Sequence, residues 1–170
     1  MKQSQNCITG EQFFIDQIIN AWRTHNKINL LLIKNIPAKG FDAVPFASKG
    51  RSVAERLVHM NKVRLGWMHY HKTGKRLKLS AIAAVPLTKV GLTRAFKQSE
   101  KEMELFMLEL LNGKAKLRAF KNNPVRWMGY IISHESHHRG SIMLALKQNG
   151  MRLPEKTALQ GLWMTWMWGK

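Results

Sequence analysis

The chain has 170 residues, 45% of them apolar, which suffices for one domain with a substantial core and excludes a disordered chain. No run approaches the roughly 18 apolar residues of a membrane span, and the N-terminus has no apolar signal core. Lysines and arginines number 28 against 10 aspartates and glutamates, giving a net charge of +18. The single cysteine, Cys7, excludes an internal disulfide and a cysteine-based zinc framework, and predicts a reducing, cytoplasmic setting.

The first half of the chain predicts two helices. A first helix spans 10–34 and ends before a linker of turn and breaker residues at 37–45. The second helix begins after Ser52, a good N-cap with Glu55 at the third helical position, and fades at 72–74. No internal repeat or low-complexity segment is visible.

The second half predicts two more long helices. The third is capped by Thr88 or Thr93 and ends at 112–113, and the fourth runs from 123–124 to Gly150. A short terminal segment, 155–168, follows. Four long amphipathic helices in a single domain, 1–170, predict an all-α four-helix bundle.

The connection between the second and third helices bears on topology. Its 14 or so residues, 74–87, reach about 46 Å at roughly 3.3 Å each. A 25-residue helix is only about 37 Å long. The connection is therefore long enough to cross back along the bundle, as an up-down-down-up arrangement requires.

Histidines cluster in the fourth helix. Three of the seven lie within five residues, and His134 and His138 are four apart, which places both imidazoles on one helix face. That face coincides with the apolar stripe expected to meet the core, whereas His137 falls at its edge. The pair predicts a metal site, and the alternative is two core histidines bonded to side chains or water.

A zinc-like ion requires a third protein ligand. His59 is the best candidate because it shares a partly apolar face of the second helix. His25 is a rival, since it lies in a first-helix stripe that runs from Phe14 to Leu32. His69 and His71 sit at a basic helix end and are expected to be solvated. Acidic residues are too scarce to offer many alternatives.

Two stretches carry a family resemblance. Gly50-Arg51-Ser52-Val53-Ala54 running into His59, and His134-x-x-x-His138-Arg139-Gly140 followed by a tryptophan-rich tail, resemble the DinB/YfiT-like family of bacterial helical bundles. The resemblance spans nearly the whole chain. It implies an up-down-down-up bundle with one metal, usually zinc or nickel, held by histidines of the second and fourth helices. Residue by residue, those ligands are His59, His134 and His138.

The resemblance does not fix the reaction. Some relatives look like thiol-dependent transferases or isomerases that use a low-molecular-weight thiol, and others look like hydrolases acting on small molecules. Three neutral imidazoles leave a divalent ion with its charge intact and an open position, which suits activation of water or a thiol. Glu55, one turn before His59, is a candidate base or orienting group. Glu135 is another, although a solvent-facing position is the stronger expectation for it.

The excess of positive charge points to a second function class. In an up-down-down-up bundle the ends of the second and third helices and the start of the fourth meet at one pole. That geometry would gather a contiguous basic pole from Lys72, Lys75, Arg76, Lys78, Lys114, Lys116, Arg118, Lys121 and Arg126. Such a pole suits nucleic acid, an anionic substrate or anionic lipid. No recognised nucleic-acid-binding motif accompanies it.

The C-terminus is unusually apolar. Trp163, Trp166 and Trp168 fall in six residues of a chain with six tryptophans and ten methionines. We expect this tail either to pack across the mouth of the bundle near the metal or to form a homodimer contact.

Overall fold

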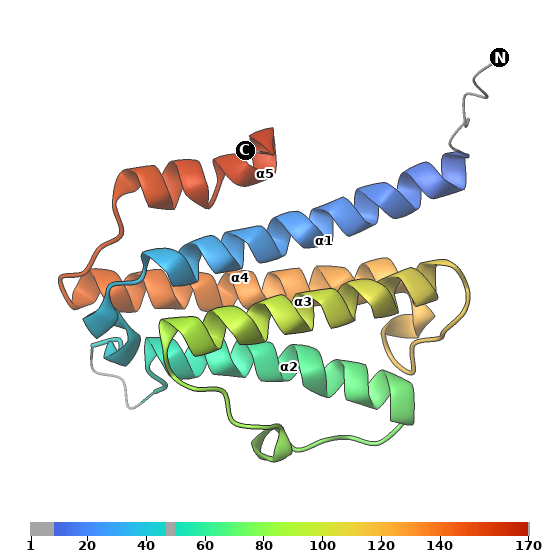
Figure 1. The fold of residues 1–170 in the computed structure, drawn as a ribbon, viewed down its shortest axis with the longest axis horizontal. Coiled ribbons are helices and arrows are strands. Elements are labelled where there is room, and N and C mark those ends of the chain that lie inside the picture. Colours follow the sequence, from blue (N-terminus) through green and yellow to red (C-terminus); the bar gives the residue numbers. More distant parts are fainter. Residues whose placement is uncertain (1–8, 47–49, 170) are drawn as a thin grey trace.

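The computed structural model describes residues 9–46 and 50–169, and this part of the chain is helical without strands (Figure 1). Four long helices dominate: α1 (Gly10–Asn35), α2 (Val53–Thr73), α3 (Lys89–Leu111) and α4 (Pro124–Gln148). Shorter helices fill the connections, namely η1 (Ala38–Asp42), η2 (Leu79–Ala81) and η3 (Phe120–Asn122). A π-helix, η4 (Lys156–Gly161), and α5 (Met164–Trp168) complete the chain. The predicted all-α class is confirmed.

Side-chain caps explain where the long helices begin. The side chains of Thr9, Ser52, Thr88 and Asn123 each accept a backbone N–H from the first turn of the helix that follows. Ser52 and Glu55 form the predicted capping box, and Thr88 rather than Thr93 caps α3. At the other end of α2, Gly74 adopts φ of +77°, the left-handed conformation that favours glycine.

The long helices surround one shared interior. α1 packs against α3 and α4, and α2 packs against the same two helices. In Figure 1, α2 and α3 run in the same direction and α1 and α4 run in the opposite one. The connection between α2 and α3 returns along the length of α2, and η2 lies within it.

The interior combines two apolar clusters. One, around Leu32, Leu57 and Phe96, lies toward the end where α1 stops and α2 starts, and the other surrounds Trp22 and Trp127. The start of the predicted apolar stripe on α1 is wrong. Phe14 is 67% exposed, and its neighbour Ile15 is buried instead. The stripe therefore begins one residue later than the sequence pattern indicated.

The C-terminal segment lies along α1 (Figure 1). Leu162 joins the core, and the Trp166 ring lies 6.4 Å from the buried ring of His25. Trp163 and Trp168 remain 64% and 66% exposed. The tail thus covers the α1 side of the molecule rather than the α2–α4 side that carries the predicted metal ligands. In the described part of the chain, no helix is long and apolar enough to cross a membrane.

Candidate metal centre

Three histidines from α2 and α4 converge at one place. His59, His134 and His138 each offer a ring nitrogen, and these nitrogens all lie within 4.8 Å of one another. The ring centroids of His134 and His138 are 4.5 Å apart, and His59 lies 5.0 Å from His138 and 5.4 Å from His134. The i, i+4 spacing on α4 and the packing of α2 against α4 account for this arrangement.

The donor set fits a divalent ion. The Nε2 atoms of His134 and His138 face each other at 3.1 Å. Two nitrogens on a tetrahedral ion with bonds of about 2.0–2.1 Å would be separated by roughly 3.3 Å, close to that distance. The Nδ1 atoms of both rings are buried, with no hydrogen-bond partner among the described residues. In a singly protonated ring an Nε2 ligand leaves the proton on Nδ1.

Burial lowers the pKa of all three imidazoles and so favours the neutral state, in which they bind metal. Burial lowers the pKa of His59 to about 4, and the nearby charge of Arg51 acts in the same direction. Burial also lowers the pKa of His138 to about 4, assisted by His134. The pKa of His134 is lowered by burial too, although Glu135 opposes the shift.

A buried polar network joins the helices behind this cluster. Glu135 is fully buried, and its carboxylate accepts two hydrogen bonds from Arg64, at 2.6 Å from Nε and 2.7 Å from Nη2. The same carboxylate accepts from His25 Nε2 at 2.8 Å and from Asn29 Nδ2 at 2.7 Å. Burial acts to raise the pKa of Glu135, but the charge and hydrogen bonds of Arg64 and the bond from His25 lower it overall. Glu135 is therefore an ionised core residue, and its predicted solvent-facing position is wrong.

The network also includes the rival ligand of the sequence analysis. His25 donates to Glu135 through Nε2, and its Nδ1 accepts from Arg139 at 3.3 Å, so both ring nitrogens have partners. Arg139 further donates to Asn29 at 2.8 Å and to Ser136 at 2.6 Å. His25 therefore belongs to a separate structural network and lies outside the three-histidine cluster.

This network bears directly on the ligands. Glu135 is adjacent to His134 in the chain, and Arg64 lies on the same helix as His59. Their ion pair thus links the two helices that supply the ligands. Arg64 is itself held by Asn26 and Ser99 and by the rings of Trp22 and Phe96 at 4.8 and 4.7 Å.

The remaining predicted histidines are not part of the three-histidine cluster. His137 is exposed on α4 and lies at the rim of the cluster, with its ring 5.3 Å from that of His138. His71 is only 3% exposed and contacts the rings of Trp67, Phe106 and Trp127, so its predicted solvation is wrong. Burial lowers the pKa of His71 to about 4, and the charge of Arg118 contributes. Its buried position follows from packing at the end of α2, which helix-end position alone does not reveal.

Glu55 lies one turn before His59 and lines the same small pocket as that ligand. Its Oε2 accepts the backbone N–H of Ser52 at 2.7 Å, and this bond lowers the pKa of the carboxyl group. The carboxylate is therefore ionised near the histidines while it caps α2.

The capping role of Glu55 gives a testable result. Glu55→Ala is expected to lower the free energy of unfolding by about 0.3–1.5 kcal/mol, because the Ser52 N–H loses its acceptor. Glu55→Gln should retain most of that stability, because an amide oxygen accepts the same bond. Urea denaturation of the two variants measures the difference, and equal losses in both would contradict the capping role.

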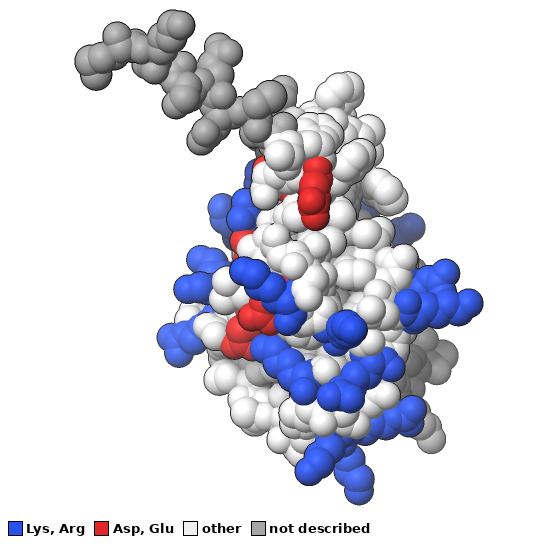
Figure 2. All heavy atoms as spheres, turned by 90° about the vertical axis from the view of Figure 1, so that its right-hand side faces the viewer, with Lys and Arg blue, Asp and Glu red and all other residues white. Residues whose placement is uncertain are grey.

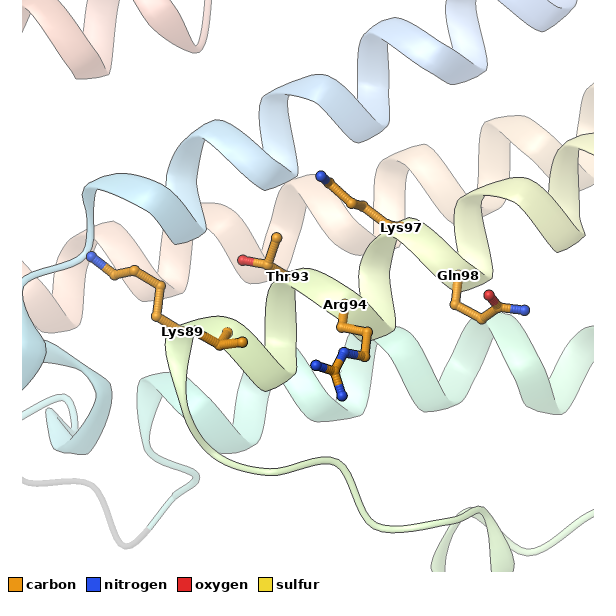
Figure 3. A pocket seen from close by; sticks show the side chains of 6 residues that line it. Lys89, Thr93, Arg94, Lys97 and Gln98 are labelled. Atoms are coloured by element: carbon orange, nitrogen blue, oxygen red, sulfur yellow. The ribbon is translucent and has the colours of Figure 1, made fainter.

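A second pocket, on the surface of α3, is lined by cations rather than by histidines. Lys89, Arg94 and Lys97 line a cavity of about 500 Å³ together with Val90, Thr93 and Gln98. Figure 3 shows the side chains of Lys89 and Lys97 extending toward α1 at opposite ends of the pocket, whereas Arg94 extends to the other side of the helix. Lys89 Nζ donates to the carbonyl oxygen of Lys34 at 2.9 Å. This pocket therefore does not concentrate its charges on one point.

Comparison with known proteins agrees with these observations. No curated protein matches the chain. A family model for the DinB family, however, matches residues 1–169. The match includes all three histidines of the cluster as well as the capping motif and the tail. The chain is therefore a member of the DinB family.

Proposed function

We propose that this protein is a metal-dependent enzyme whose ion is held by His59, His134 and His138. The observation that carries the proposal is the convergence of three imidazole nitrogens within 4.8 Å. Zinc or nickel is the ion we propose, because the family resemblance implies one of these two and imidazole ligands suit both. The proposal includes the up-down-down-up four-helix bundle, with which the directions of the long helices in Figure 1 agree.

The reaction we propose is a thiol-dependent transfer or a hydrolysis of a small molecule. A divalent ion bound by three neutral ligands supplies Lewis-acid chemistry, which suits activation of a thiol or of water. The protein's own residues contribute positioning. The Arg64–Glu135 pair holds α2 and α4 in register, and Glu55 supplies an ionised carboxylate one turn from His59, where we propose that it accepts or orients a proton.

Metal analysis tests the site. Protein purified without a nickel column should retain close to one equivalent of metal, and His59→Ala and His138→Ala should each retain far less. His137→Ala is the matched control, since that histidine is exposed on the same helix, and it should retain the wild-type amount. Wild-type protein without metal, or equal metal in all variants, would refute the site.

A second candidate function rests on the basic pole. All the lysines and arginines predicted to form it are exposed. Figure 2 views the molecule from the side where α2 and α3 end and α4 begins, and Lys and Arg outnumber Asp and Glu on that face. Arg118 joins two of these segments, since it donates to the carbonyl oxygen of His71 at 3.1 Å. We propose nucleic acid as the alternative partner of this face.

A salt titration tests the nucleic-acid alternative. Binding to random duplex and single strands should be independent of sequence and should weaken steeply with salt, because each neutralised phosphate adds about −0.9 to the log–log slope. Reversing the charge of Lys72, Lys75, Lys78 and Lys121 should reduce that slope. Absence of binding at low salt, or a slope unchanged by the reversal, would leave the basic pole without this role.

The exposed tail supports a proposed homodimer. Trp163, Met167 and Trp168 form an uncovered apolar patch. Truncation before this segment would also remove Leu162 from the core, so substitution is the cleaner test. A Trp163→Gln, Trp168→Gln variant should sediment as a monomer while the wild type sediments as a dimer. A monomeric wild type would exclude the dimer.

A further inference from the structure

A pocket lined by aromatic rings lies beside the three-histidine cluster. Trp67 and Tyr70 of α2 and Tyr130 of α4 form its walls, and its volume is about 460 Å³. The remaining lining comes from Val63, Gly66, Arg76, Leu77, Leu79 and Ala119. The pocket is thus built from α2, α4 and the two connections that meet beside them.

The pocket adjoins the candidate metal ligands on both helices. The Tyr130 ring stacks on the His134 ring, with centroids 6.0 Å apart and planes 20° apart. Val63 lies one helical turn beyond His59, a spacing that brings side chains to about 5–6 Å at Cβ. Leu79, the first residue of η2, lines both this pocket and the smaller pocket beside His59. The two pockets are therefore neighbours on the side of the molecule that η2 covers. A molecule in the aromatic pocket would therefore lie next to the ligands.

The rings are held in place by one another. Trp67 is half-buried and meets Tyr130 edge-on at 5.8 Å and Tyr70 at 6.0 Å. Phe120 contacts the Trp67 ring at 4.9 Å, and His71 stacks on it at 5.6 Å. Edge-to-face packing of this kind fixes ring orientation. A flat ligand would find a preorganised apolar wall.

Charge adds a second requirement for the ligand. Arg76 lines the pocket, whereas no aspartate or glutamate does, and the described residues give Arg76 no ion pair. A guanidinium group offers a planar fork of donors that matches a carboxylate or phosphate. The α3 pocket of Figure 3 has more cations but no aromatic wall. Among the pockets described above, only this one combines an aromatic wall with an unpaired cation.

We propose that this pocket binds a flat organic anion, with its conjugated or aromatic body against Trp67 and Tyr130 and its carboxylate or phosphate on Arg76. Delivery of that anion to the metal centre rests on the proposed function. Binding itself does not, because none of the pocket's lining residues is a metal ligand. The proposal therefore names the class of substrate or cosubstrate for the metal site.

Calorimetric titration of the full chain with 2-naphthoate, 2-naphthyl phosphate and neutral 2-naphthamide tests the proposal. Both anions should bind saturably, and the stronger of them identifies the acidic group. Arg76→Met should weaken the anions by about tenfold or more and leave the amide unchanged, because a charge-assisted hydrogen bond is lost. Tyr130→Ala should weaken all three. Lys97→Met, which removes an exposed cation from the α3 pocket, should change none.

Two further comparisons distinguish binding in this pocket from metal binding and from binding of anions to the basic pole. His59→Ala should lose metal yet retain naphthoate binding, and wild-type protein that binds naphthoate but no metal would refute only the proposed function. Naphthamide carries no charge that the basic pole could attract, so a loss of its affinity in Tyr130→Ala separates the pocket from that pole. Absence of saturable anion binding, an unchanged affinity of the anions in Arg76→Met, or an unchanged affinity of the amide in Tyr130→Ala would overturn the proposal.

Discussion

Glu135→Ala is expected to lower the free energy of unfolding by about 3–5 kcal/mol, because it leaves Arg64 charged and unpaired in the core. Arg64 and Glu135 are both fully buried, and four hydrogen bonds from Arg64, His25 and Asn29 end on that carboxylate. Alanine also leaves those donors without an acceptor. Chemical denaturation of purified variants measures the loss.

An exposed ion pair provides the control. Arg23 donates to Glu104 at 2.6 and 2.8 Å, a bidentate contact like that of Arg64 but with the Arg23 side chain 59% exposed. Glu104→Ala should cost about 0–1 kcal/mol, because solvent screens the pair. Glu135→Gln, which keeps the shape of the side chain, provides a folded variant if alanine is not tolerated. Equal losses at positions 104 and 135 would show that the buried network does not hold α2 and α4 together.

Metal should stabilise the protein strongly, and only through the three histidines. At a free zinc or nickel concentration near 100 times the dissociation constant, binding to the folded state adds about 2.7 kcal/mol. For a domain of this size that gain corresponds to a rise in Tm of roughly 5–10 °C. Differential scanning fluorimetry after chelation and metal addition measures it.

Histidine variants test whether the rise in Tm depends on the three proposed ligands. His59→Ala and His138→Ala should lose the rise in Tm, because each removes one of three ligands. His137→Ala should retain it, since the exposed His137 ring is outside the cluster. A rise that persists in His59→Ala would place the bound metal elsewhere.

Local sequence signals predicted much of the fold. Ser52 and Glu55, Thr88 and Asn123 set the helix starts through hydrogen bonds within a few residues, which a sequence pattern captures. The i, i+4 pair His134 and His138 is local in the same way. Its partner His59 depends on how α2 packs against α4. The partly apolar face of the second helix made His59 the best candidate, and the family resemblance favoured it over the rival His25.

The sequence could not predict the buried polar network, because the residues that pair in it are distant from one another in the chain. Glu135 and Arg64 are 71 positions apart, and His25 and Glu135 are 110 apart. A single charged residue next to an apolar stripe looks like a boundary residue until its partner is known. One signal was available: His25, Asn26 and Asn29 place polar groups on the inward side of α1, which requires partners from other helices.

The helix that the C-terminal tail contacts could not be predicted from the sequence either. Its apolar composition indicated that it covers some surface, but three exposed or half-exposed tryptophans do not specify which helix they meet. Only the packing of Leu162 into the core and of Trp166 over His25 assigns the segment to α1.

X-ray absorption spectroscopy at the metal edge tests the central claim most directly. On protein loaded with one equivalent of zinc, the spectrum should show three imidazole ligands with nitrogens at about 2.0–2.1 Å and no sulfur. His59→Ala should lose one imidazole contribution or the metal itself. A spectrum with fewer than three imidazoles, with sulfur ligation, or unchanged in His59→Ala would contradict a three-histidine centre.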